Sequence, residues 1–280
     1  FYAILELYAS GMYAQGFVDC GMVDYGGTTK HTLLFFVHLP GYYPAVVALF
    51  PDDDGPNAPQ VLFQTSAPST GGSGTHVITH WHGAKFLTNV GGVSGNNLLV
   101  AYSGDGIDSA GIYLCNDVAD FILHPATWAT RWGMDKVGTE RSTLLNAADY
   151  AYAIGTCRRY ATSELVWSPA LKPLAMVPNA DNSKAYYIAD YPGAGTYTQC
   201  VEVNFLTRSA RVVQGNLIGI GGGGIRTSNG YMLLFMGSEY AANNVPYSFS
   251  DGYNRIYAVA PDGSGIKEIY QWLRKDVADG

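Results

Sequence analysis

Three histidines that lie close together in the sequence are the first candidates for chemistry. His76, His80 and His82 flank Trp81. In an extended strand His80 and His82 project from the same face, and His76 has the same parity, so the three imidazoles could converge as metal ligands do. No carboxylate lies close in sequence to complete the ligand set. Two interpretations stay open: a site for one divalent metal ion, or partly exposed histidines beside a Gly/Ser loop with no cofactor, which we favour.

Acidic residues offer further candidates, but none has a decisive spacing. Asp52-Asp53-Asp54 and the pair Asp105 and Asp108 could bind calcium through clustered oxygens. Adjacent carboxylates cannot all face one ion, so solvated acidic turns are the expected alternative. A glycosidase needs two carboxyl groups that converge in the fold. The spacing selects no pair among the six acids that we considered for this role, Asp19, Asp24, Asp149, Glu164, Asp190 and Glu239.

Aromatic and amide side chains gather in one long segment, residues 239–254. Its candidate binding residues are Tyr240, Asn243, Asn244, Tyr247 and Tyr253. A tyrosine can stack on a sugar ring or fill a protein interface while its hydroxyl forms a hydrogen bond, and long loops on rigid scaffolds often carry function. We therefore predict a binding site for a glycan or a protein partner here. The alternative is ordinary half-buried tyrosine on the faces of sheets.

Several classes of site are not indicated. The glycine run at 221–224 lacks the Gly-Lys-Ser/Thr ending of a phosphate loop, and we expect it to allow close packing of strands instead. No Gly-x-Ser-x-Gly nucleophile elbow occurs. Basic residues do not cluster beyond Arg158-Arg159 and Arg274-Lys275, and the net charge is -7. A nucleic-acid partner is therefore not expected.

Composition and pattern indicate many short strands. Charged residues make up 14% of the 280 residues, against about 25% in an average soluble domain, while Gly 34 and Tyr 21 are both high. Strand-like runs occur in groups that longer loops separate. The clearest group contains the runs 231–236, 255–260 and 266–272, the last two joined by a Pro-Asp-Gly-Ser-Gly turn. A β-sandwich would also use short strands, but repeating groups favour a propeller. We predict an all-β single domain, a β-propeller of about five four-stranded blades, or six. The approximate blades are 12–65, 75–125, 128–180, 183–215 and 216–273, with little helix and with 120–124 as a strand.

Two segments resemble TolB-type, WD-like propeller repeats. Residues 165–175 are similar to the Trp-Ser-Pro-Asp-Gly-Lys lead-in of that repeat, with Ala170 and Leu171 where the motif has Asp-Gly. Residues 255–265 resemble its outer hairpin, an Ile-Tyr strand that turns through Asp-Gly-Ser-Gly. The resemblance covers about a quarter of the chain and implies the fold without an activity. His80-Trp81-His82 is also similar to a metal-binding lead-in of oligogalacturonate-type propeller lyases, which would imply a metal ion there.

Cysteine count and the chain start bear on localisation. Cys20, Cys115, Cys157 and Cys200 allow two disulfides in three pairings, or four unrelated buried thiols. The sequence begins at Phe1 and is poor in Lys but rich in Tyr, Gly, Ser, Thr and Asn. We expect an extracellular protein, or one on a virion or cell surface. No apolar run approaches the ~20 residues of a membrane-spanning helix.

These observations leave three hypotheses for function. The first is a non-enzymatic propeller, displayed outside the cell or on a particle, that binds a glycan or protein partner through loop aromatics. The second is a carbohydrate-active enzyme, either a metal-assisted polysaccharide lyase or a glycosidase. The third is a structural subunit of a virion or filament, as a homo-oligomer or larger assembly with apolar surface that only neighbours cover.

Overall fold

The chain is described by a computed structural model over residues 13–38, 45–51, 60–64, 81–103, 111–131, 172–190, 198–207, 209–237 and 252–273. Within these ranges it contains fifteen strands and three short helices. No helix in this part of the chain is long and apolar enough to span a bilayer. Residue contacts divide the chain into two compact units, residues 1–154 and 155–280, and each unit is described by itself below.

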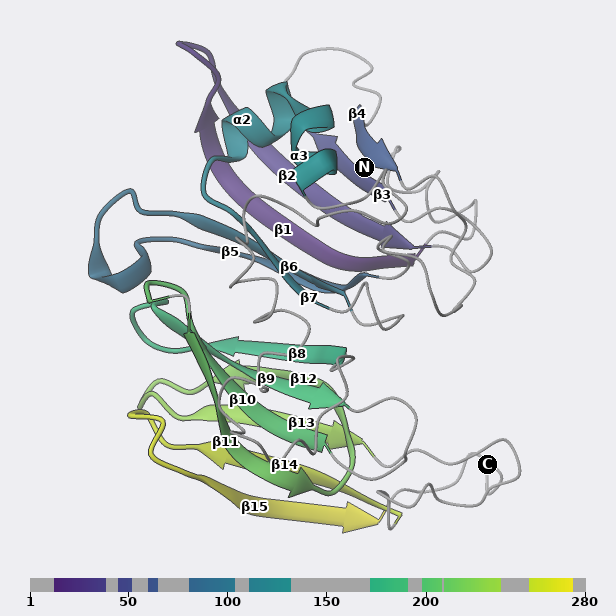
Figure 1. The fold of residues 1–280 in the computed structure, drawn as a ribbon, viewed down its shortest axis with the longest axis vertical. Coiled ribbons are helices and arrows are strands. Elements are labelled where there is room, and N and C mark those ends of the chain that lie inside the picture. Colours follow the sequence, from purple (N-terminus) through teal and green to yellow (C-terminus); the bar gives the residue numbers. More distant parts are fainter. Residues whose placement is uncertain are drawn as a thin grey trace. The chain divides into compact units, whose positions relative to one another are not determined.

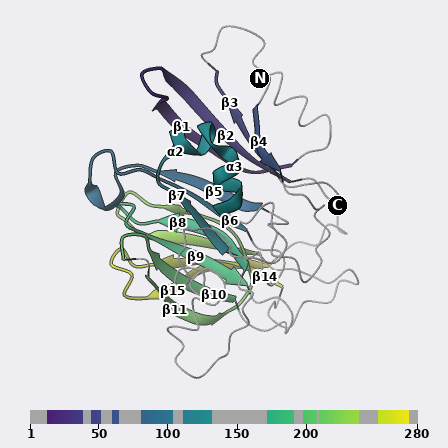
Figure 2. The ribbon, with the colours of Figure 1, turned by 45° about the horizontal axis from the view of Figure 1, so that its top comes forward.

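The first unit begins with a four-stranded antiparallel meander in the order β1-β2-β3-β4. Its strands are β1 (Tyr13–Asp24), β2 (Thr29–His38), β3 (Ala45–Leu49) and β4 (Gln60–Gln64). The hairpin of β1 and β2 extends beyond the shorter strands β3 and β4 (Figure 1, Figure 2). In β2, Leu34 and Phe36 belong to one apolar cluster and Phe35 and Val37 to another. This alternation buries both faces of the strand, as its continuous apolar run predicted.

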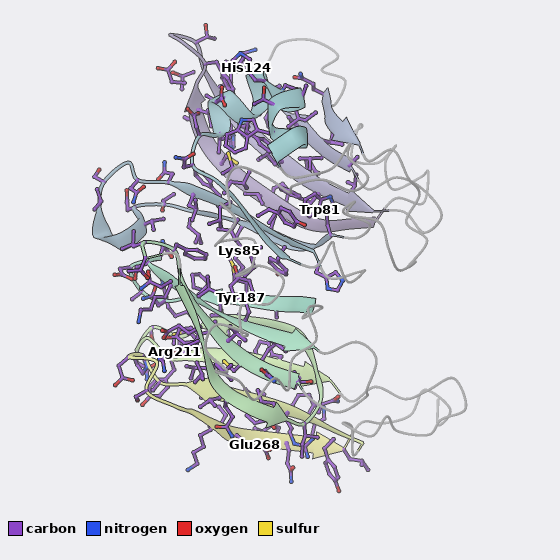
Figure 3. The ribbon with its side chains drawn as sticks, in the orientation of Figure 1. Trp81, Lys85, His124, Tyr187, Arg211 and Glu268 are labelled. Atoms are coloured by element: carbon purple, nitrogen blue, oxygen red, sulfur yellow. The ribbon has the colours of Figure 1, made fainter. Side chains whose placement is uncertain are left out.

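The second sheet of this unit has three strands and is followed by two helices. Its elements are β5 (Trp81–Leu87), the 3-10 helix η1 (Val90–Gly92), β6 (Leu98–Ser103), β7 (Gly111–Cys115), α2 (Val118–Leu123) and α3 (Pro125–Arg131). The sheet order is β5-β6-β7, again antiparallel. Trp81 packs edge-on against Phe36, with ring centroids 5.0 Å apart, and against Tyr113 at 5.9 Å (Figure 3). Trp81 thereby joins the two sheets of this unit.

The strand predicted at 120–124 is wrong, because this segment belongs to α2. Asp117 caps the helix by accepting a hydrogen bond from the Asp120 backbone N–H at 2.9 Å. Val118, Phe121 and Ile122 then lie on one buried face at helical spacing. The helix is only six residues long, so a period of 3.6 has little room to show itself in the sequence. The Asp117 cap was the available signal.

The second unit consists of two four-stranded antiparallel sheets in the orders β11-β10-β9-β8 and β12-β13-β14-β15. The strands of the first sheet are β8 (Lys172–Pro178), β9 (Lys184–Asp190), β10 (Thr198–Asn204) and β11 (Ser209–Leu217). Those of the second are β12 (Ile220–Arg226), β13 (Met232–Gly237), β14 (Tyr253–Val259) and β15 (Ile266–Leu273). The apolar core between them includes Ile188, Leu234 and Val259. Figure 1 shows both meanders in green and yellow.

Strand β8 pairs with β9, although the predicted blade limits at 180 and 183 separate them. The two strands form one hairpin, closed by a hydrogen bond from the Lys184 backbone N–H to the Asn179 side-chain oxygen at 3.0 Å. Asn182 has a φ of 56°, a left-handed conformation that asparagine tolerates better than most residues. The β8–β9 turn is thus built on Asn179, Asp181 and Asn182 instead of Gly.

The hairpin predicted in the repeat-like segment 255–265 is present as the β14–β15 turn. The Gly263 backbone N–H donates to the Ala260 carbonyl at 2.8 Å, and the Ala260 N–H donates to the Gly265 carbonyl at 3.0 Å. Gly263 has a φ of 71°, which favours glycine. Asp262 accepts from the Ser264 N–H at 2.9 Å. The turn chemistry therefore follows directly from the sequence.

In both units the first strands of consecutive sheets lie against each other, β1 with β5 and β12 with β8. Glycines permit this approach. A Cβ on Gly16 of β1 would lie 2.7 Å from the Ala84 backbone nitrogen of β5, and one on Gly224 of β12 would collide with the Val177 side chain of β8. The expectation that the glycine run allows close strand packing is thus confirmed at Gly224.

The predicted fold class is confirmed: the described part of the chain is all-β apart from its short helices. Its sheets are antiparallel meanders of three or four strands that converge through their first strands within each unit. This is the organisation of β-propeller blades. The number of blades and their grouping in a single domain stay predictions. Much of the predicted blade 128–180 lies outside the described residues.

We expect Gly224→Ala to destabilise the protein by about 1–3 kcal/mol, the usual cost of overpacking a tight contact. Its new methyl group would meet Val177 and would lie 2.6 Å from the Leu233 carbonyl oxygen. Gly222→Ala, in the same strand, is the matched control, since its methyl would meet only the Phe235 carbonyl at 3.7 Å. Urea unfolding curves with unchanged slopes would measure the difference. Equal midpoints for the two variants would contradict the close approach.

Candidate functional site

The predicted histidine cluster is only partly described. His82 lies on β5, while His76 and His80 lie outside the described residues. Within the described ranges, no group of three or more His, Cys, Asp or Glu side chains could hold a metal ion. The metal hypothesis therefore stays a prediction.

The predicted aromatic loop is described only at its end. Tyr240, Asn243, Asn244 and Tyr247 lie outside the described residues. Tyr253 is the first residue of β14 and keeps 37% of its surface exposed.

The surroundings of Tyr253 are ordered by a buried cation. The Arg255 guanidinium carbon lies 5.9 Å from the Tyr253 ring centroid, a cation–π distance. Arg255 also donates to the Tyr253 carbonyl at 3.1 Å and to the Glu268 carboxylate at 3.0 Å. Figure 3 shows Glu268 on β15. Tyr253 is thus held by Arg255 and stays partly exposed.

A pocket of about 250 Å³ lies in the first unit, where four segments far apart in the sequence meet. They are the end of β1, the end of β5, the loop after η1 and the first turn of α2. The residues that line it are Cys20, Met22, Val23, Asp24, Phe86, Gly95, Asn97, Asn116, Asp117, Val118 and Ala119. Two carboxylates and two carboxamides therefore share a small cavity with an aromatic ring, a thioether and aliphatic side chains.

Turn hydrogen bonds hold the polar groups of this pocket in place. One Asp24 oxygen accepts from the Gly27 N–H at 2.7 Å, and one Asp117 oxygen accepts from the Asp120 N–H at 2.9 Å. The Asn97 oxygen accepts from the Asn89 N–H at 3.2 Å, which leaves its amide donors available. The backbone thus fixes one oxygen of each acid, and the second can serve a ligand. Among the candidate acids of the sequence, Asp24 is one that the fold brings to a cavity.

Cys20 contributes an apolar wall to the pocket and no nucleophile. Burial raises the pKa of its thiol to about 12, with a small further rise from the neighbouring Asp19 charge. A thiol with so high a pKa stays protonated near neutral pH. Cys115 lies in the same apolar cluster, and burial also raises its pKa. Cys20, Cys115 and Cys200 are all buried free thiols, which agrees with the second of the two sequence interpretations; Cys157 lies outside the described residues.

The other described acids take part in local pairs. Asp19 accepts from the Gly21 N–H at 2.8 Å and contacts His31 Nε2 at 2.9 Å, and these bonds lower its pKa. Asp120 contacts His124 Nδ1 at 2.7 Å and accepts from the Trp128 indole N–H at 2.7 Å. The first pair lies on the exposed face of a hairpin, and the second ties α2 to α3.

The strongest electrostatic cluster of the described chain surrounds Glu202, in the second unit. Glu202 stands directly opposite Tyr186 on β9 and Arg211 on β11. Arg211 donates two hydrogen bonds of 2.9 Å to its carboxylate, Tyr186 donates one of 2.7 Å, and Lys184 lies 3.4 Å away. Arg211 also donates to the Gly263 carbonyl at 2.7 Å, so the cluster connects the two sheets of this unit (Figure 3).

The charge of Glu202 is well compensated. Burial raises its pKa, but the hydrogen bonds from Arg211 and Tyr186 and the positive charges of Arg211 and Lys184 outweigh burial, so the pKa lies below its usual 4.5. The pKa of Tyr186 is raised by burial and by its bond to Glu202. A Cβ on Gly263 would collide with the Tyr186 hydroxyl. Both carboxylate oxygens of Glu202 are occupied by these partners, so the cluster connects strands and does not present a free acid.

Sequence reasoning missed both the pocket and this cluster. Glu202 was visible as one acid inside an apolar run, but its partners come from strands whose register only the fold defines. The pocket residues are separated by up to about 100 positions and share no motif.

The comparisons with known proteins add three structural likenesses. No protein-family model matches the chain, and no curated protein matches it. The β-propeller domain of Cps50 (Swd1) from Myceliophteria thermophila is 12% identical, with 95% of this chain and 60% of that chain covered and a TM-score of 0.42. The nidogen/laminin complex is 9% identical, with 92% and 79% covered and a TM-score of 0.40. A luciferin-regenerating enzyme is 10% identical, with 90% and 61% covered and a TM-score of 0.35.

This chain thus spans about 60% of the length of the first of these structures. Since all three TM-scores are below 0.5, the fold assignment depends on the strand order of the chain itself.

We expect Glu202→Gln to destabilise the protein by about 3 kcal/mol, the low end for breaking a buried ion pair, because Arg211 is partly exposed. A double-mutant cycle with Arg211→Gln separates the pair from the rest of the fold. The effects of the two substitutions should be strongly non-additive. Additive effects in urea unfolding would show that the two side chains do not interact.

The Glu202–Arg211 pair should also make the free energy of unfolding depend on pH. Since the folded-state pKa of Glu202 is below its usual 4.5, its stabilisation is fully present above pH 4.5 and is lost as pH falls through the folded value. Unfolding free energies measured from pH 6 to pH 3 should therefore fall less in Glu202→Gln than in the parent chain. Parallel pH curves would contradict the lowered pKa.

Proposed function

We propose that this chain is a non-enzymatic binding protein of β-propeller type, displayed outside the cell or on a particle, and that its first unit binds a neutral sugar unit of a glycan. The observation that carries the proposal is the pocket lined by Asp24, Asn97, Asn116 and Asp117 around an apolar wall. The chemistry of that lining matches the chemistry of a sugar, which presents hydroxyls on its rim and C–H groups on its faces.

The polar side chains of the pocket can form hydrogen bonds with neighbouring hydroxyl groups of a sugar. Carboxylates accept hydrogen bonds from hydroxyls, and ionised acceptors form stronger bonds than neutral ones. The carboxamides of Asn97 and Asn116 add donors and acceptors. Phe86 and Met22 offer apolar surface to the C–H face of a ring.

Size and charge narrow the ligand class. A cavity of 250 Å³ is just below the ~300–1,000 Å³ typical of sites for drug-sized ligands, so it suits one sugar unit. Two carboxylates repel an anionic sugar, and this chain carries a net charge of -7. We therefore expect neutral sugars to be preferred over uronic or sialic acids.

The aromatic segment at 239–254 remains a second proposed contact for a glycan or protein partner. Tyr253 supports it, because its ring is held by Arg255 and stays partly exposed. The kinship to TolB-type repeats belongs to the same proposal, and the β14–β15 turn with its positive-φ Gly263 supports it.

We expect Asn116→Ala to weaken binding of a neutral glycan about 10-fold, the effect of losing one or two hydrogen bonds. Asp24→Asn should weaken it as well, while the amide oxygen keeps the turn bond to Gly27. A glycan array would select the ligand, and calorimetric titration would measure the affinity. Asn229→Ala, in an exposed turn of the second unit, is the matched control and should leave the affinity unchanged.

Three outcomes would overturn the proposal. They are an array without a neutral ligand, a preference for acidic glycans, and an Asn116→Ala affinity equal to that of the control. Cleavage of the bound glycan over time would replace it with the glycosidase hypothesis.

A further inference from the structure

The pocket of the first unit has an apolar floor, which is continuous with the core of that unit. Cys20 and Val118 line the pocket, expose 5% and 8% of their surface, and belong to the buried apolar cluster. Val23 and Phe86 also line it and pack against the same cluster as half-buried side chains. These four side chains are called the floor below. A ligand group that reaches them leaves water for an apolar surface.

The polar residues lie at the rim of the same pocket. Asp24, Asn116 and Asp117 are exposed, and Met22 is the one apolar side chain that shares their exposure. Asn97 is half-buried and therefore lies deeper than the other polar groups. A bound molecule must therefore turn an apolar group towards the floor and its polar groups towards the rim.

This division discriminates between neutral sugars. A plain hexose carries a hydroxyl on nearly every carbon, and a hydroxyl against the floor would lose its hydrogen bonds to water without replacement. A methyl group in the same position gains free energy by leaving water. The floor therefore favours a sugar whose substituent ends in a methyl group.

Asn97 adds a requirement for a hydrogen-bond acceptor. Its side-chain oxygen accepts from the Asn89 backbone N–H at 3.2 Å, so its two amide N–H groups are the donors that can serve a ligand. The carboxylates of Asp24 and Asp117 supply only acceptors, and each has one oxygen in a turn hydrogen bond and one that is not. The pocket thus offers a donor, an acceptor and an apolar surface. An acetamido group presents their complements, a carbonyl oxygen, an N–H and a methyl.

We propose that the pocket binds an N-acetylated amino sugar through its acetamido group. The methyl packs on the floor, the carbonyl oxygen accepts from Asn97, and the N–H donates to one of the two carboxylates. This inference rests on the proposed function and narrows its ligand class from neutral sugars to acetamido sugars. The acetamido group is uncharged, so it avoids the repulsion that the two carboxylates impose on acidic sugars.

The test is calorimetric titration of the full chain with matched methyl glycosides. The acetamido probes are those of N-acetylglucosamine and N-acetylgalactosamine, and the reference probes are those of glucose and galactose. We expect the acetamido sugars to bind at least about 10-fold more tightly, from one added hydrogen bond and one buried methyl. The glycosides of glucosamine and galactosamine, which carry a free amine, should bind more weakly than the acetamido sugars because they lack the methyl and the carbonyl.

Cys20→Ser tests the floor. It places a hydroxyl in the floor with little change in size, and it should reduce the preference for the acetamido sugar over its parent hexose about 5-fold or more. Cys200→Ser is the matched control, because Cys200 is also a buried free thiol but lies in the second unit and does not line the pocket. It should leave the preference unchanged.

Asn97→Asp tests the donor and does not depend on the folding of Cys20→Ser. The aspartate keeps an oxygen for the Asn89 N–H but replaces the amide donors with an acceptor, so the preference for the acetamido sugar should be lost. Asn229→Asp is the charge-matched control, in an exposed turn of the second unit. It should bind both classes of sugar as the parent chain does.

The outcomes separate this inference from the proposed function. Hexoses or free amino sugars that bind as tightly as the acetamido sugars would overturn the inference and leave a neutral-sugar site standing. Equal effects of Cys20→Ser and Cys200→Ser, or of Asn97→Asp and Asn229→Asp, would overturn it by placing the preference outside this pocket. A chain that binds no neutral sugar would overturn both.

Discussion

The close approach of first strands is the constraint on which the rest of each unit depends. Backbones can approach so closely only where no Cβ intervenes, and Gly16 and Gly224 occupy those positions. The contact brings β1 against β5 and β12 against β8. The outer strands of the sheets, by contrast, have different surroundings.

Three of the outer strands, β7, β11 and β15, differ in what lies beside them. After β7, the helices α2 and α3 follow, and the cap of α2 supplies Asp117 to the pocket. Beside β11, the Glu202 cluster binds the turn at Gly263 and closes the space between sheets. At β15, apolar side chains are left exposed. The contact between first strands is thus similar in both units, while the outer strands differ in what packs against them.

Burial and charge compensation explain which groups are chemically available. Glu202 is buried but fully paired, and the Cys20 thiol has a pKa of about 12, so neither is poised for catalysis. The pocket acids Asp24 and Asp117 have one oxygen held by the backbone and one left for a ligand. This contrast shows how the surroundings of an ionisable group decide whether it is available to another molecule.

The sequence by itself determined the local features. Alternation and turn residues predicted the all-β class, the β14–β15 hairpin around Gly263, and the meander of residues 12–65, because these depend on neighbours a few positions apart. It missed the helix capped by Asp117, which is too short for a helical period. Only the tertiary structure decided that Glu202 meets Arg211 and that the pocket residues converge, since strand register joins positions with no shared motif. Whether an apolar residue is core or surface was also decided there: Ile269 and Ile188 have the same side chain, but only Ile188 has a second sheet packed over it.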